Sequence, residues 1–138
     1  MDTLSFERLL LPLALLLLSV GGCQSLQSRQ SNIELEKILS SYQTTVRWSS
    51  PEQAYLFLQP ERYAKESLPS GLDNIRVTSY EVIRPPIALS EGVVNQTAKI
   101  SYVLTDRQIE RTLMDEQIWE YQAEEKIWYR INPIPEYK

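Results

Sequence analysis

The sequence predicts an α+β domain, with N-terminal helices packed on one face of a curved antiparallel sheet of about four strands. Two observations predict this class. Helical periodicity is confined to the first half of the chain, and segments with strand-like alternation, separated by short polar turns, make up the second half. The chain has 138 residues, of which 43% are apolar and 23% are charged, as is typical of one globular core. We therefore expect a single domain over residues 33–138.

Two helices are predicted in the first half. The first runs from Ile33 to Trp48, because apolar residues recur there at intervals of three and four and so share one helix face. These residues are Leu35, Ile38, Leu39, Tyr42 and Val46. The second helix is predicted over Pro51–Leu58, with Ser50 at the N-cap position and Gln53 placed for a capping box.

Four strands are predicted in the second half. A turn around Gly71 leads into the first, Ile75–Ile83, which is rich in β-branched and aromatic residues and is expected to end before Pro85. The other three strands are predicted over Val93–Thr105, Ile109–Tyr121 and Ile127–Ile131. Because their connections are short, neighbouring strands are expected to pair in antiparallel fashion as a meander.

The two predicted turns between the last three strands set the register of pairing. Pairing Thr105 with Gln108 and Ala123 with Lys126 places seven pairs on one face of the sheet. They are Leu104 with Ile109, Tyr102 with Arg111, Ile100 with Leu113, Ala98 with Asp115, Val94 with Trp119, Tyr121 with Trp128, and Trp119 with Arg130. On this face buried charges cost several kcal/mol unless they are paired. Arg111 and Asp115 are therefore expected to meet each other, to reach solvent, or to line a wet cavity.

A wet cavity would make the concave face of the sheet a binding pocket. Its lining would be Tyr102, Arg111, Asp115, Gln117, Trp119, Trp128 and Arg130. An arginine there would attract an anionic or carbonyl group, and the tryptophans would supply an apolar wall. The alternative is that the strands extend past the helices and their long side chains reach water. A wider aromatic set either stacks against sugars or apolar ligands or simply fills the core; it comprises Trp48, Trp119, Tyr121, Trp128 and Tyr129.

Composition argues against several classes of function. The sequence contains no histidine and one cysteine, Cys23, so it offers no imidazole base and no site built from several cysteines. The net charge of −4 argues against nucleic-acid binding, which depends on clustered Lys and Arg. We expect no cofactor and assign no catalytic residue. An acid/base enzyme centred on Asp115 with Tyr102 is kept only as a third hypothesis.

The N-terminal residues predict export. The apolar run from Leu9 to Val20 is too short to cross a hydrocarbon layer, which needs about 20 residues, so residues 1–22 are predicted to be a signal peptide. Val20-Gly21-Gly22-Cys23 follows and resembles the lipobox of bacterial lipoproteins. This resemblance implies cleavage before Cys23, which would carry a diacylglyceryl group and an N-acyl chain, and Gln24 in place of Asp implies the outer membrane. Residues 24–32 are polar and are expected to form a flexible tether.

Further segments resemble small lipoproteins of Gram-negative bacteria with an NTF2-like (cystatin-like) fold. They are Val46-Arg47-Trp48, Tyr80-Glu81-Val82, Trp119-Glu120-Tyr121 and Ile127-Trp128-Tyr129. The leading hypothesis is a lipid-anchored, periplasm-facing module that binds a periplasmic or envelope protein without catalysis. The alternative is a small-ligand binder that uses the concave pocket. A homodimer is also possible through the convex face, where Val103, Met114 and Ile118 lie.

Overall fold

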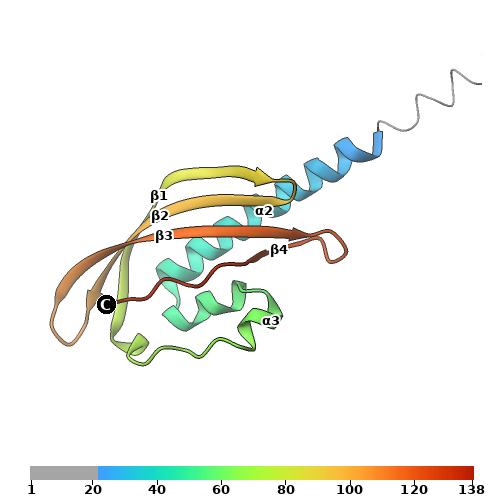
Figure 1. The fold of residues 1–138 in the computed structure, drawn as a ribbon. Coiled ribbons are helices and arrows are strands. Elements are labelled where there is room, and N and C mark those ends of the chain that lie inside the picture. Colours follow the sequence, from blue (N-terminus) through green and yellow to red (C-terminus); the bar gives the residue numbers. More distant parts are fainter. Residues whose placement is uncertain (1–21) are drawn as a thin grey trace, which may run out of the picture. The chain divides into compact units, whose positions relative to one another are not determined.

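The computed structural model describes residues 22–138, and the residues after Ile33 form one compact unit, Glu34–Lys138 (Figure 1). This unit is an α+β domain, as predicted. The predicted signal peptide up to Gly21 and the side chain of Cys23 lie outside the described residues. In the described part of the chain, no helix combines the length and the apolar content that crossing a bilayer requires.

Helix α2 spans Gly22–Trp48 and is the longest helix described. It begins well before the predicted start at Ile33, so residues 24–32 are helical where a flexible tether was predicted. The tether prediction is wrong because it relied on polar composition alone. Gln, Leu and Arg favour helices, and no Gly or Pro interrupts this stretch. The predicted apolar face is confirmed, because Leu35, Leu39, Tyr42 and Val46 are buried and Ile38 is half-buried.

The segment after α2 is the 3₁₀-helix η1 (Pro51–Phe57), which lies where the second helix was predicted and ends one residue earlier. Ser50 occupies the N-cap position, but its side chain makes no capping hydrogen bond, so the predicted capping box is wrong. The short helices α3 (Pro60–Tyr63) and η2 (Leu72–Asn74) follow. Gly71 precedes η2 with a φ of 82°, a left-handed conformation that glycine adopts readily, and confirms the predicted turn.

Four antiparallel strands form one open sheet in the order β1-β2-β3-β4. Their bounds are Ile75–Ser90 for β1, Val93–Leu104 for β2, Ile109–Gln122 for β3 and Ile127–Arg130 for β4. The predicted register is confirmed at every pair, including Ala98 opposite Asp115 and Trp119 opposite Arg130. Alternation on a half-buried sheet fixes this register, since a slip of one residue would turn the buried side chains outward.

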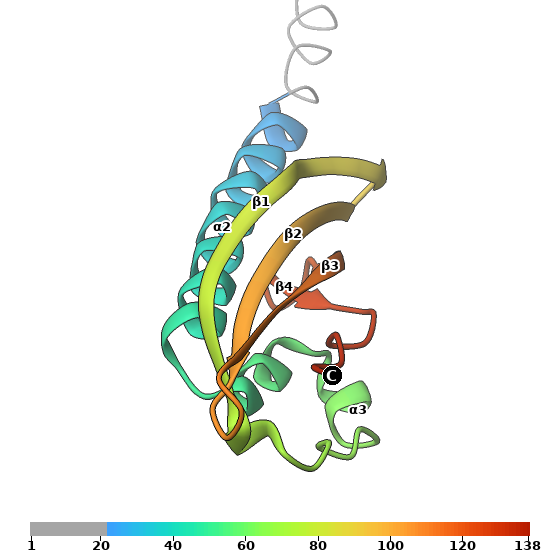
Figure 2. The same ribbon diagram turned by 90° about the vertical axis from the view of Figure 1, so that its left-hand side faces the viewer.

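Strand β1 continues through Pro85 and Pro86 to Ser90, although the sequence predicted its end at Ile83. It pairs only with β2 and is therefore an edge strand, where a proline that lacks its N–H group removes no ladder hydrogen bond on the free side. Register shifts between Val82 and Arg84 and between Arg84 and Ile87 accommodate the prolines. The sheet is strongly curved along this strand (Figure 2).

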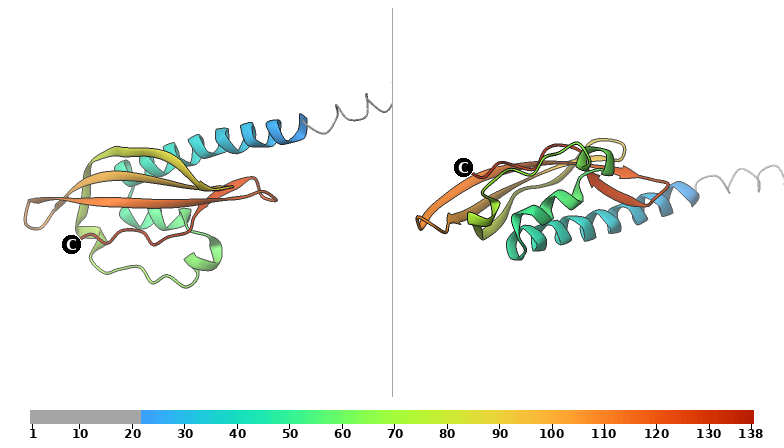
Figure 3. Two further views of the ribbon diagram at one scale, coloured as in Figure 1. Left: turned by 45° about the horizontal axis from the view of Figure 1, so that its top comes forward. Right: turned by 90° about the horizontal axis from the view of Figure 1, so that it is seen from below.

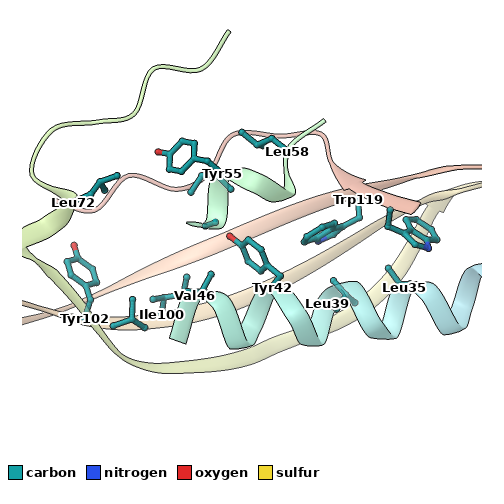
Figure 4. Close-up of a cluster of buried hydrophobic side chains, with 14 residues drawn as sticks. Leu35, Leu39, Tyr42, Val46, Tyr55, Leu58, Leu72, Ile100, Tyr102 and Trp119 are labelled. Carbon is teal, nitrogen blue, oxygen red and sulfur yellow. The ribbon is translucent and has the colours of Figure 1, made fainter. Parts of the chain in front are cut away.

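The core fills the concave face of the curved sheet. The part of α2 after Ile33 and the helix η1 lie on the same side of the sheet (Figure 3), and their side chains interleave with those of the strands (Figure 4). Tyr42 meets Trp119 edge-on, with 5.3 Å between the ring centroids, and meets Phe57 in the same way at 5.2 Å. Residues 131–138, which we call the closing segment, fill the remaining space. Their Ile134 side chain is buried in the core.

Candidate functional site

A buried ion pair lies at the centre of the concave face. Arg130 of β4 donates from Nη2 to Oδ1 of Asp115 on β3 at 2.7 Å and from Nη1 to Oδ2 at 3.1 Å. The Asp115 and Arg130 side chains are 0% and 1% exposed. Tyr42 of α2 completes the triangle, because its hydroxyl donates to Asp115 Oδ2 at 3.0 Å and accepts from Arg130 Nη1 at 2.7 Å. This two-pronged, charge-assisted geometry is the kind that offsets the cost of burying two charges.

Gln117 extends the network toward β1 and β2. Its Nε2 donates to Asp115 Oδ2 at 2.9 Å and to the hydroxyl of Tyr80 at 2.7 Å. Its Oε1 accepts from Gln96 Nε2 at 3.3 Å and from Trp119 Nε1 at 3.2 Å. The polar side chains of this face therefore hydrogen-bond one another, as buried polar groups generally do.

Arg130 also holds the closing segment. Its Nη2 donates to the carbonyl oxygens of Pro133 at 2.8 Å and Glu116 at 3.2 Å, and its Nε donates to that of Asn132 at 3.2 Å. At the far end of the segment, the Tyr102 hydroxyl donates to the Lys138 carbonyl oxygen at 2.7 Å. The arginine thus serves both as the counter-charge of Asp115 and as the attachment point of residues 131–138.

Burial and neighbouring charges shift the pKa of three groups in this network. Burial raises the pKa of Tyr42 well above its usual value, and burial raises the pKa of Tyr80 to about 12. Burial alone would lower the pKa of Arg130, but Tyr42 and Asp115 beside it raise that pKa above its usual value. General acid or base catalysis needs contact between the catalytic group and a substrate, and the side chain of Asp115 is 0% exposed.

The predicted pocket on the concave face is filled by the core. Six of its seven predicted lining residues are buried; they are Tyr102, Asp115, Gln117, Trp119, Trp128 and Arg130. Of the three alternatives left open for Arg111 and Asp115, Arg111 takes the second, because it is exposed, and Asp115 takes none of them, because it pairs with Arg130. The side chains of α2, η1 and the closing segment occupy the volume that a ligand would need.

An open cleft lies elsewhere, where α2 ends beside the start of β1. It has a volume of about 590 Å³, and we call it the Trp48 cleft. Residues from the ends of four elements and their connections line it; they are Arg47, Trp48, Ser49, Ser50, Pro51, Leu72, Asp73, Ile75, Arg76, Val77 and Thr78. Its volume lies within the range of about 300–1,000 Å³ that small-molecule sites occupy.

Trp48 and Arg47 form one wall of this cleft. The indole of Trp48 is 74% exposed, and the guanidinium carbon of Arg47 lies 4.0 Å from the centre of the ring. Arg47 Nη1 also donates to the Val77 carbonyl oxygen at 2.9 Å, which ties the end of α2 to β1. The cation–π contact and the hydrogen bond together hold the indole in place at the surface.

Several polar groups of the cleft are unpaired. Among residues 22–138, the guanidinium of Arg76 and the carboxylate of Asp73 take part in no ion pair or side-chain hydrogen bond. The hydroxyl oxygen of Thr78 is buried and also has no partner. An unpartnered buried polar atom is uncommon in folded proteins and calls for an explanation.

Sequence reasoning considered only one residue of this cleft as a candidate for binding. Trp48 belonged to the aromatic set interpreted as either a stacking platform or core, and the structure divides that set, since Trp119 and Trp128 are buried. Asp73 lies in the short helix η2 after a turn, and Arg76 and Thr78 lie at the start of an edge strand, so no periodic pattern marks them. The exposed Trp48 directly after a basic residue, at the end of a helix, was the one available signal.

No protein-family model, curated protein or solved structure matches this chain. In the described part of the chain, no three His, Cys, Asp or Glu side chains gather to hold a metal ion.

Proposed function

We propose that this chain is a lipid-anchored protein of the bacterial envelope and that its domain binds a component of the envelope without catalysing a reaction. The observation that carries the binding role is the contrast between two sites. The charges of the concave face are buried and fully hydrogen-bonded, whereas the Trp48 cleft is open and holds the exposed, unpaired side chains of Arg76 and Asp73. Binding needs accessible, unpaired groups of this kind.

The anchoring role is supported by the sequence. Val20-Gly21-Gly22-Cys23 follows a short apolar run, in the order that resembles a lipobox. Two or more acyl chains on Cys23 would anchor the protein stably, because each buried methylene contributes about 0.8 kcal/mol. Gln24 favours the outer membrane, with the domain facing the periplasm. The order of helices followed by a curved four-stranded meander supports an NTF2-like fold as part of this proposal.

The anchor is tested by mass spectrometry of the protein isolated from a Gram-negative host. We expect the N-terminal peptide to begin at Cys23 and to carry the added mass of three acyl chains. The Cys23→Ser variant should keep its leader and lose the lipid. The Gln24→Asp variant keeps the cysteine and should move from the outer-membrane to the inner-membrane fraction. An unmodified Cys23 in a chain that retains residues 1–22 would contradict the proposal.

The binding role is tested in intact cells with a photo-reactive amino acid placed at position 49, because Ser49 is exposed, lines the Trp48 cleft and leaves the indole in place. We expect cross-linked species that are absent when the same group replaces Arg84, which is exposed on β1 outside the Trp48 cleft. Equal cross-linking from both positions, or none from position 49, would show that the cleft is not a binding surface.

A further inference from the structure

The structure points to a sugar that carries a carboxylate as the ligand of the Trp48 cleft. We infer this from three features of the cleft: an exposed indole fixed at the surface, a free guanidinium, and unpaired hydroxyl and carboxylate groups. The inference rests on the proposed function only for the source of the sugar, which in the envelope would be an acidic glycan of the cell wall or an acidic polysaccharide.

The indole of Trp48 offers a flat apolar surface to a sugar ring. A pyranose has faces rich in C–H groups and edges rich in hydroxyls, so it needs an accessible aromatic plane with polar groups around it. Trp48 is 74% exposed, and the Arg47 guanidinium stacks at 4.0 Å from its centre. Because Arg47 is itself held by the Val77 carbonyl oxygen, the plane is ordered before a ligand arrives, which lowers the entropic cost of binding.

The positive charge of Arg76 favours a ligand that carries a carboxylate. Its planar guanidinium carries no partner among the described residues and can donate two parallel hydrogen bonds to a carboxylate. Asp73 lines the same cleft and can accept hydrogen bonds from sugar hydroxyls. The same carboxylate repels a dianionic phosphate, so the cleft favours a sugar ring that carries one negative charge and several hydroxyls.

The buried hydroxyl of Thr78 and the free side chain of Ser50 complete this polar rim. Thr78 Oγ1 has no partner, and Ser50 makes no capping bond although it stands at an N-cap position. The Ser50 hydroxyl can donate to and accept from a sugar hydroxyl, whereas Thr78 Oγ1 is covered and reaches one only after its side chain rotates. A volume of about 590 Å³ accommodates a ligand of disaccharide size.

Isothermal titration calorimetry on the purified full-length chain in detergent micelles tests the inference with four probes. They are the disaccharide of N-acetylglucosamine and N-acetylmuramic acid, digalacturonic acid, neutral diacetylchitobiose and inorganic phosphate. We expect at least one acidic disaccharide to bind, at least tenfold tighter than the neutral disaccharide. A preference for the muramic acid probe identifies a cell-wall source, and a preference for digalacturonic acid identifies a uronic-acid polysaccharide.

Two variants and two matched controls locate the binding. Trp48→Ala should abolish binding. Arg76→Gln should weaken the binding of the acidic probe at least tenfold, to the affinity of the neutral disaccharide. Both side chains are exposed, so the circular dichroism and the unfolding midpoint should stay unchanged. Tyr63→Ala removes an exposed aromatic ring on α3, and Arg84→Gln removes an exposed arginine on β1; neither should alter binding.

Failure of this inference is distinct from failure of the proposed function. No binding of any sugar, equal binding of acidic and neutral sugars, or binding of phosphate as tight as that of the acidic sugars would overturn the inference. A lipidated chain with such a result would keep its anchor and lose only this ligand class. A chain that binds the acidic sugar but carries no lipid on Cys23 would keep the cleft and lose the proposed anchor.

Discussion

Replacing Arg130 with methionine removes the counter-charge of a carboxylate that has no access to water. Asp115 would then keep only Tyr42 and Gln117 as hydrogen-bond donors. Breaking a buried pair in this way costs about 3–5 kcal/mol. Three carbonyl oxygens that accept hydrogen bonds from Arg130 would also lose a donor. We therefore expect the loss of unfolding free energy to lie at the upper end of that range.

A loss of this size is a large fraction of the stability of a small domain, which is about 5–15 kcal/mol. With a urea dependence of about 1.5 kcal/mol per molar, we expect the Arg130→Met midpoint to fall by about 2–3 M. Unfolding can be followed by tryptophan fluorescence, because Trp119 is fully buried against Tyr42 and becomes exposed on unfolding.

Two further variants make this prediction specific. Arg111→Met applies the same chemical change to an exposed arginine on the same sheet, and its free energy of unfolding should change by less than about 0.5 kcal/mol. The double variant Asp115→Leu with Arg130→Met removes both charges and should recover about 2 kcal/mol or more relative to Arg130→Met. If Arg130→Met lowers the midpoint no more than Arg111→Met does, Asp115 is not a sealed charge and the reasoning fails.

Three other changes have defined outcomes. Ile134→Ala should lower the free energy of unfolding by about 2–5 kcal/mol in urea titrations, because this buried side chain fixes the closing segment. A change below about 1 kcal/mol would mean that the closing segment is loosely held. Gly71→Ala should cost about 1–2 kcal/mol in the same assay through its positive φ alone, because a Cβ there meets no atom within 4 Å. The raised pKa of Tyr80, about 12 against an ordinary 10, means that the folded state keeps a proton which the unfolded state loses, so stability should fall between about pH 10 and 12 by up to about 3 kcal/mol. Tyr80→Phe should flatten that fall when urea midpoints are compared across this range, and an unchanged slope would contradict the assignment.

The strands and their register were predictable because two short turns and a two-residue alternation leave one solution. The sequence therefore predicted that Ala98 pairs with Asp115, and the structure confirms this pair. The extent of β1 was missed because Pro85 was interpreted as the end of the strand, although the predicted meander already placed this strand at the edge, where proline is tolerated.

Strand register alone could not predict that Asp115 pairs with Arg130. Direct pairing places Arg130 opposite Trp119, four residues along β3 from Asp115, so only the length and direction of the arginine side chain bring the charges together. Tyr42 joins them from α2, and the periodicity of a helix predicts which face is buried but not where along the sheet it docks. The Trp48 cleft was hidden for a related reason, because residues at the ends of elements build it.

The chain order of Asp115 and Arg130 has one more consequence. A fragment that stops after β3 contains the carboxylate but not the guanidinium, so a globule formed from it would enclose an unpaired charge. Compaction of such a fragment is therefore disfavoured until Arg130 is present. A chain cut anywhere between β3 and residue 130 should stay loose instead of forming a smaller folded domain.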